Sequence, residues 1–70
     1  MKYMIILEKT RTGFSAYCPD LPGCIATGRT QGAVERRMKQ ALEMHLEGLA
    51  SVGQKRPSPH SFSSYVDIPT

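Results

Sequence analysis

The residues of this chain that could do chemistry are few, and their spacing matches no common reactive site. Its two cysteines, Cys18 and Cys24, have five residues between them, which is not the C-x-x-C spacing of a zinc or redox motif. His45 and His60 stand at no ligand spacing to either cysteine. A disulfide or a metal pair is the alternative, but reduced thiols on a sheet fit the general behaviour of free cysteine better. We therefore expect no metal ion and no cofactor.

The carboxylates form no recognisable catalytic set either. Glu8, Asp20 and Asp67 are the acids nearest the expected strands, whereas the other acids fall in the expected helix. A two-metal nuclease needs several carboxylates that converge on ions about 4 Å apart, and nothing in this spacing indicates such convergence. The sequence therefore favours a protein without catalytic residues, and a residual nuclease that uses Asp20 and Asp67 is a minor alternative.

The basic residues could recognise phosphate. The net charge is +3 and the sequence pI is about 9.1, which invites a nucleic-acid interpretation. No aromatic residues interleave with the basic ones as in a base-stacking surface, and no RNA- or DNA-binding motif is present. A charge of this size is normal for a small soluble domain, so a solvated surface is favoured over a nucleic-acid-binding one. The candidate nucleic-acid contacts under the alternative are Arg29, Arg36, Arg37 and Lys39.

Three short apolar stretches near the N-terminus are expected to form a sheet. Residues 2–8 are nearly continuously apolar, and residues 14–18 and 24–28 alternate apolar or small side chains with polar ones. The pattern in the second stretch places Phe14, Ala16 and Cys18 on one face. Two prolines stiffen residues 19–23 and Gly23 allows a sharp change of direction, so we expect a rigid turn there and an antiparallel meander of three strands.

The next stretch has the spacing of a long amphipathic helix. Its apolar residues recur every three or four positions from residue 31 to about residue 52. Thr30 is the expected N-cap, and Gly53 is the expected stop signal. Gly32 and Gly48 lie inside the helix, where each is unfavourable relative to alanine and is expected to permit a close backbone approach.

The C-terminal residues alternate again and predict a fourth strand. Residues 54–61 contain two prolines and indicate an extended connection, and residues 62–68 then alternate apolar and polar side chains. The expected fold is therefore α+β, with the order β-β-β-α-β: a three-stranded antiparallel meander, one long helix and a fourth strand. Residues 1–70 are expected to form a single domain.

A domain as small as this one is expected to need extra stabilisation. A chain of 70 residues buries only about 60% of its unfolded surface, so apolar burial and ordering entropy nearly cancel. With a disulfide and a metal disfavoured, we expect a homodimer or a higher homo-oligomer. Tyr3, Ile5 and Tyr17, expected on the sheet face away from the helix, are the candidate self-association residues. Without a secretory or membrane-spanning stretch, the chain is expected to be cytoplasmic.

Several strings in the chain resemble the HicB family of antitoxins. They are FSAYCPDLPGC at residues 14–24, QALEMHLEGL at residues 40–49 and PSP at residues 57–59, so the resemblance covers nearly the whole chain. The most characteristic part is the string Pro-Asp-Leu-Pro-Gly-Cys at residues 19–24. The resemblance implies a partial ribonuclease H-like fold without a working nuclease site.

The same resemblance implies a function. It predicts a type II antitoxin that binds a small HicA-type toxin, an mRNA-cleaving ribonuclease, and covers its active site. An orphan HicB-like protein without a toxin is the alternative. Because many members carry a C-terminal DNA-binding domain for which this chain has no room, direct DNA binding is not expected. A rigid loop loses little entropy on docking, so the expected partner-binding residues are Pro19, Asp20, Leu21, Pro22 and Gly23.

Overall fold

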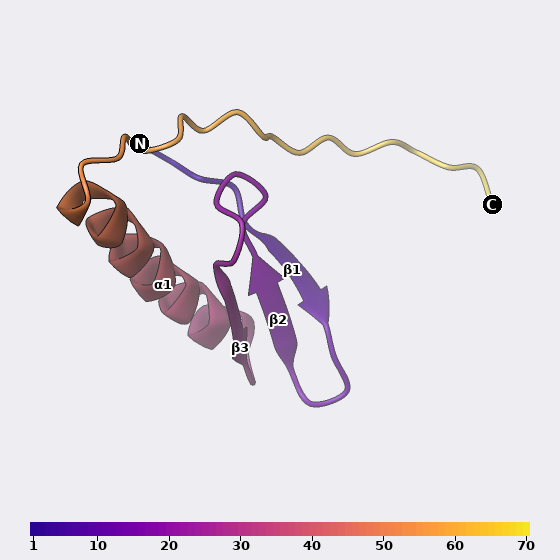
Figure 1. The fold of residues 1–70 in the computed structure, drawn as a ribbon. Helices are drawn as coiled ribbons and strands as arrows, with labels where there is room; N and C mark the ends of the chain where they lie inside the picture. The colour runs from indigo at the N-terminus through magenta and orange to yellow at the C-terminus, as the bar shows by residue number, and fades with distance from the viewer.

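A computed structural model describes all residues, 1–70, and shows a three-stranded antiparallel sheet followed by one long helix (Figure 1). The elements are β1 (Ile6–Lys9), β2 (Phe14–Tyr17), β3 (Ile25–Gly28) and α1 (Gln31–Ser51). The strands lie in the order β1-β2-β3, with both pairs antiparallel. The α+β class and the three-stranded meander are therefore confirmed, although β1 starts four residues later than expected.

The register of the sheet decides which side chains face the helix. Leu7 of β1 lies opposite Ala16 of β2, and Ala16 lies opposite Ala26 of β3. Ala16 is buried, so this row faces the core. The alternate row, in which Tyr17 of β2 has Ile6 and Ile25 as cross-strand neighbours, faces the opposite side. The alternation expected for residues 14–18 is confirmed.

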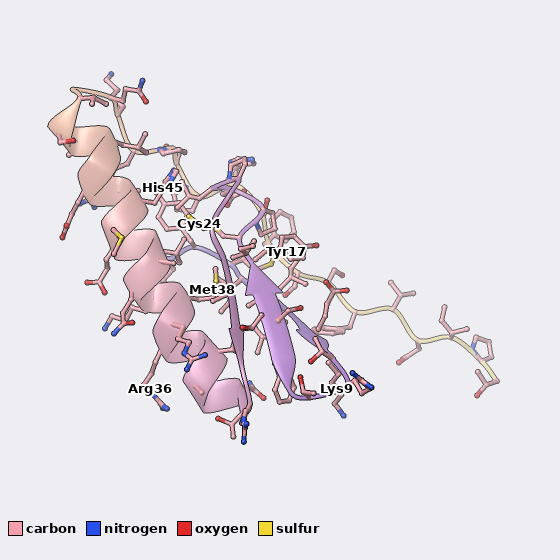
Figure 2. The ribbon with its side chains drawn as sticks, turned by 60° about the horizontal axis from the view of Figure 1, so that its bottom comes forward. Lys9, Tyr17, Cys24, Arg36, Met38 and His45 are labelled. Atoms are coloured by element: carbon pink, nitrogen blue, oxygen red, sulfur yellow. The ribbon has the colours of Figure 1, made fainter.

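The core lies between the sheet and α1. Val34 and Met38 of the helix are completely buried, and Figure 2 shows Met38 between the helix and the strands. Cys18, Leu21 and Cys24, which flank or belong to the turn between β2 and β3, complete the buried cluster. The helix packs on β3 and β2 rather than on β1. The turn is thus part of the core and not a loose connection.

Both helix ends follow the local signals in the sequence. The Thr30 hydroxyl oxygen accepts a hydrogen bond from the Ala33 amide at 3.1 Å, as an N-cap does. At the other end, the amides of Gly53 and Gln54 donate to the last turn of the helix, and Gly53 has a φ of 75°. This left-handed conformation is the usual helix stop at glycine. The structure contains no helix with the length and apolarity needed to cross a membrane.

Close backbone approach occurs at glycines outside the helix. A Cβ atom on Gly13 would lie 2.3 Å from the Gly28 carbonyl oxygen, and one on Gly28 would lie 2.8 Å from the Val34 amide nitrogen. A Cβ atom on Gly48 would meet nothing within 4 Å, and one on Gly32 would meet only the tip of a flexible side chain at 3.4 Å. The expectation for Gly32 and Gly48 is therefore wrong, because both positions face solvent.

The expected fourth strand is not formed within this chain. Residues 54–70 contain neither helix nor strand, and their C-terminal part runs away from the sheet (Figure 1). Phe62 is 86% exposed, although the alternating pattern marks it for a sheet face. A strand is defined by hydrogen bonds to a neighbouring strand, and residues 62–68 have no such neighbour here. The segment does alternate apolar and polar side chains, but no neighbouring strand pairs with it in this chain.

Candidate partner-binding surface

The turn of residues 19–23 is tied together by its own backbone. The Leu21 amide donates to the Cys18 carbonyl at 3.2 Å, and the Cys24 amide donates to the Leu21 carbonyl at 3.3 Å. A further bond of 3.4 Å joins the Cys18 amide to the Cys24 carbonyl and closes the turn at its base. Gly23 has a φ of 92°, which side chains with a Cβ atom rarely adopt. These constraints make the turn rigid.

The five expected partner-binding residues divide into a buried and an exposed group. Leu21 is completely buried in the core, and Asp20 is buried beside it. Pro19 is half-buried, whereas Pro22 and Gly23 are exposed. Leu21 and Asp20 therefore hold the turn in place, and only its apex is free to contact another molecule.

Asp20 binds the chain that returns from the helix. Its carboxylate oxygens accept hydrogen bonds from the amides of His60 at 3.0 Å and Ser61 at 3.1 Å, and from the Ser61 hydroxyl. The His60 Nε2 atom also lies 3.2 Å from the Asp20 Oδ1 atom. The Ser61 hydroxyl, the two amides and His60 together lower the pKa of Asp20 below its ordinary value, against an opposing effect of burial. The sequence contains no local signal for this contact, which joins residues 40 and 41 positions apart.

We expect Asp20 to make the stability of the chain dependent on pH. Because folding lowers the pKa of this carboxyl, its contribution is present above the unfolded value of about 3.9 and is lost as pH falls through the lower folded value. Thermal unfolding of Asp20→Asn should show a lower melting temperature than wild type at pH 7. The difference should shrink as pH falls below about 4, near the carboxyl's unfolded pKa.

Asp67→Asn is the matched control, because Asp67 is an exposed carboxylate in the same C-terminal segment. This variant should follow the wild-type pH profile. A melting temperature for Asp20→Asn equal to that of wild type at pH 7 would contradict the assigned role of Asp20.

A groove with a mixed apolar and polar lining lies between the apex of the turn and the helix. We call it the turn–helix groove, and its lining residues are Gly23, Cys24, Ile25, Ala41, Met44 and His45. Ile25 is 73% exposed and Met44 is 72% exposed. Two of the lining residues are labelled in Figure 2: Cys24 lies on the turn side of the groove, and His45 lies on the helix. The sequence did not predict that Ile25 and Met44 belong to a site. The one signal for Met44 is that it is a large apolar residue outside the buried stripe of the helix.

The four candidate nucleic-acid residues do not form one patch. Arg29 and Arg37 line a groove at the start of the helix, where Arg37 also donates to the Thr27 carbonyl at 2.8 Å. Arg36 points away from the sheet (Figure 2), and Lys39 lines a different groove. The structure thus brings Arg29 and Arg37 together and separates the other two from them.

The expected placement of the self-association residues is partly wrong. Tyr3 and Ile5 pack against the core on the helix side, and the Tyr3 hydroxyl donates to the Pro57 carbonyl. Both residues precede β1 and pack against the same buried cluster as Leu7, which lies opposite the buried Ala16. Tyr17 alone lies on the sheet face away from the helix, as expected.

Metal-binding and nucleophilic groups do not gather anywhere in the chain. The structure contains no group of three or more His, Cys, Asp or Glu residues that could hold a metal ion. Cys18 and Cys24 are both free and buried. Burial, and the nearby Cys18 thiol, raise the pKa of Cys24, which disfavours the reactive thiolate. Asp20 is occupied by the returning chain, so it does not combine with Asp67 in a nuclease site.

A family model described as the HicB-like antitoxin of bacterial toxin–antitoxin systems matches residues 3–70. The chain belongs to the HicB-like antitoxin family. Its curated relatives include an uncharacterised 14.9 kDa protein of Haemophilus phage HP1, 30% identical over 69 residues that make up 99% of this chain and 52% of the phage protein. A UPF0150 protein of Thermoplasma acidophilum is 33% identical over 58 residues, or 81% of this chain and 84% of that protein.

Solved structures of HicB antitoxins share the fold of this HicB-like chain. The crystal structure of the antitoxin HicB3 matches with a TM-score of 0.72 and 37% identity over 81% of this chain. A complex of HicA3 and HicB3 matches with a TM-score of 0.70 and 35% identity over 86% of this chain. This chain covers about half of the phage relative and 42% of the first HicB3 chain, but 70% of the chain in the complex.

Proposed function

We propose that this HicB-like chain is an antitoxin that binds a HicA-type toxin and covers its RNA-cleaving site. The observation that carries the proposal is the likeness to the HicA3–HicB3 toxin–antitoxin complex, at 35% identity over 86% of this chain. The identity extends through most of the folded body, so the chain has a comparable scaffold on which to present a binding surface. The chain itself acts by occupying the toxin, and no catalytic residue is required of it.

The turn–helix groove is the best candidate for the toxin-binding surface. Its turn is closed by backbone hydrogen bonds and by the buried Leu21, so little conformational entropy is lost on docking. Ile25 and Met44 present large apolar side chains on either side of a shallow groove. Apolar anchors in a small pocket, surrounded by polar residues, are typical of the centre of a protein interface.

A nucleic-acid-binding function has less support. The four candidate residues divide between two grooves and the solvent, and of these four only Arg29 and Arg37 lie together. Such a function predicts binding that weakens steeply as salt concentration rises. Salt-sensitive binding of RNA by the purified chain, lost in an Arg29→Glu/Arg37→Glu variant, would favour it over the antitoxin proposal.

The proposal is tested by purifying the tagged full chain from its own cells and identifying what comes with it in fixed ratio. The identified partner is then produced alone and assayed for cleavage of RNA, with and without the HicB-like chain. We expect a small protein whose cleavage of RNA stops at an equimolar amount of this chain. A chain that carries no protein, or a partner whose RNA cleavage it does not reduce, would contradict the proposal.

Substitutions in the groove locate the surface. Ile25→Lys and Met44→Lys should each weaken toxin binding by about 30-fold or more, because a lost interface anchor is worth about 2 kcal/mol. Val52→Lys is the matched control, since Val52 is also an exposed apolar residue but lies at the C-terminal cap of the helix and does not line the groove. Calorimetric titration measures the affinities, and circular dichroism checks the fold. Equal affinities for all three variants would place the toxin elsewhere.

A further inference from the structure

The two cysteines are cross-strand neighbours at the base of the turn of residues 19–23. Tyr17 of β2 lies opposite Ile25 of β3, so the next pair in the same register is Cys18 and Cys24. A backbone hydrogen bond of 3.4 Å from the Cys18 amide to the Cys24 carbonyl extends the ladder to this pair. Residues directly opposite each other share one face of an antiparallel pair, and both cysteines belong to the buried cluster. The two thiols therefore face each other in the core.

This cross-strand arrangement is close to the geometry of a disulfide. Directly opposite residues of an antiparallel pair have Cα atoms about 4.5–5.5 Å apart, and a disulfide usually spans about 4.4–6.8 Å. Their Cβ atoms are about 4.5–5.5 Å apart, whereas a disulfide brings them to about 3.5–4.5 Å. Bond formation between the two cysteines therefore requires an approach of about 1 Å.

The backbone at the base of the turn allows such an approach. The Cys18–Cys24 pair is held by one ladder bond only, because the Cys24 amide donates to the Leu21 carbonyl and the Cys18 carbonyl accepts from the Leu21 amide. The neighbouring Gly23 carries no side chain, and a Cβ atom at this position would meet nothing within 4 Å. The two strands can therefore close slightly at this point without loss of the paired residues of β2 and β3.

Cys24 is the thiol that an oxidant meets first. It lines the turn–helix groove and is 5% exposed, whereas Cys18 is 2% exposed. The Cys24 thiolate attacks a small disulfide such as oxidised glutathione, which forms a mixed disulfide and releases one small thiol. The Cys18 thiolate then attacks the Cys24 sulfur and releases the second small thiol. The two protein thiols thus lose two electrons and two protons, and the small disulfide takes them up.

Burial makes this exchange slow without making it unfavourable. The raised pKa of Cys24 keeps its thiolate scarce at neutral pH, and the thiolate is the form that attacks. The equilibrium depends instead on how closely the folded chain holds the two sulfur atoms. The free thiols of this structure are therefore a persistent resting state that responds to sustained oxidising conditions.

We infer that Cys18 and Cys24 form a redox modification site, at which a reversible disulfide closes the turn of residues 19–23 at its base. Disulfides inside cells are usually transient and redox-sensing, which fits a pair that is reduced at rest. The bond would lock the turn whose apex borders the turn–helix groove. The inference rests on the geometry of the chain itself and not on toxin binding, so it and the proposed function can fail separately.

The first test is the exchange equilibrium of the purified full chain in glutathione buffers, measured in the native state and in concentrated urea. Trypsin releases residues 12–29 as one peptide that contains both cysteines, so mass spectrometry after acid quenching and alkylation gives the fraction with the internal disulfide. The equilibrium constant should be higher in the native chain by about 10-fold or more, because the fold holds the two thiols together. An equal or lower constant in the native chain would overturn the inference.

The melting temperature provides a second measurement on the same protein. A disulfide that fits the native geometry must stabilise the folded chain by the same factor that the fold favours the disulfide. The oxidised chain should therefore melt about 5 °C or more above the reduced chain. An oxidised chain that melts at or below the temperature of the reduced one would show that the bond distorts the fold, and the inference would be wrong.

A cysteine pair with the same spacing on the helix is the matched control. Met44→Cys/Ala50→Cys is made in a Cys18→Ala/Cys24→Ala background, and circular dichroism checks its fold. Both control positions are exposed, but six positions along a helix rise about 9 Å, so the native chain should hold this pair apart. Its disulfide should be less favoured in the native state than in urea. If the control behaved like the natural pair, spacing alone would explain the result. The wild-type comparison needs no substitution and decides the matter even if the alanine background is unstable.

Discussion

Met38→Ala should lower the free energy of unfolding by about 2–5 kcal/mol, the usual result of truncating a completely buried large side chain. Met38 lies between the helix and the strands, in contact with the buried cluster that includes Leu21 and Cys18 (Figure 2). A domain of this size has a total stability of only about 4–10 kcal/mol. The substitution should therefore leave the chain partly unfolded near physiological temperature.

Met44→Ala provides a control on the same helix with the same chemical change. Because Met44 is largely exposed, its truncation should change stability by less than about 0.5 kcal/mol. Urea unfolding followed by circular dichroism gives both values. If the two variants lost similar stability, the buried face of α1 would have to be assigned differently.

Gly28→Ala should destabilise the chain by about 1–3 kcal/mol, as overpacking does where the surroundings cannot give way. The added Cβ atom would lie 2.8 Å from the Val34 amide nitrogen and 3.1 Å from the Val34 Cα atom. Both are backbone atoms of the first helical turn, so relief requires the helix to move away from β3. Val34 is itself buried, and such a movement would open the core.

Gly48→Ala is the control for the glycine substitution, and it should have the opposite sign. Gly48 lies inside α1, where an added Cβ atom meets nothing within 4 Å, so alanine should stabilise the helix by about 1 kcal/mol. Thermal unfolding of the two variants should therefore show melting temperatures on either side of the wild-type value. Destabilisation by Gly48→Ala, or none by Gly28→Ala, would contradict the packing described for α1.

Most elements of the fold were predictable from local patterns, because local chemistry determines them. The helix was expected from its apolar spacing, and its ends from Thr30 and Gly53, whose capping interactions involve residues only a few positions away. The alternation over residues 14–18 likewise indicated the buried face of β2, because the period of two is a property of any strand. The early part of the first strand was the exception, since a nearly continuous apolar run shows neither its boundary nor its faces.

The candidate site was less predictable, because its residues come from separate elements. The turn of residues 19–23 was expected to be rigid, but nothing local indicated that Leu21 and Asp20 point inward. The partner of Asp20 lies about 40 positions away, and Met44 and Ile25 line one groove only because α1 packs on β3. Contacts between distant residues depend on how the elements pack, and a single sequence carries no direct record of that packing.

The sequence by itself determined the class of the fold, the bounds of the helix and the resemblance to HicB antitoxins, because each rests on residue types at short, regular spacing. Tertiary structure decided which glycines are indispensable for packing, which turn residues are exposed and that Tyr3 and Ile5 face the core. It also decided the position of the C-terminal segment. The alternation over residues 62–68 specifies a strand, but a strand needs an edge to pair with, and the identity of that edge is a property of the folded molecule and its partners.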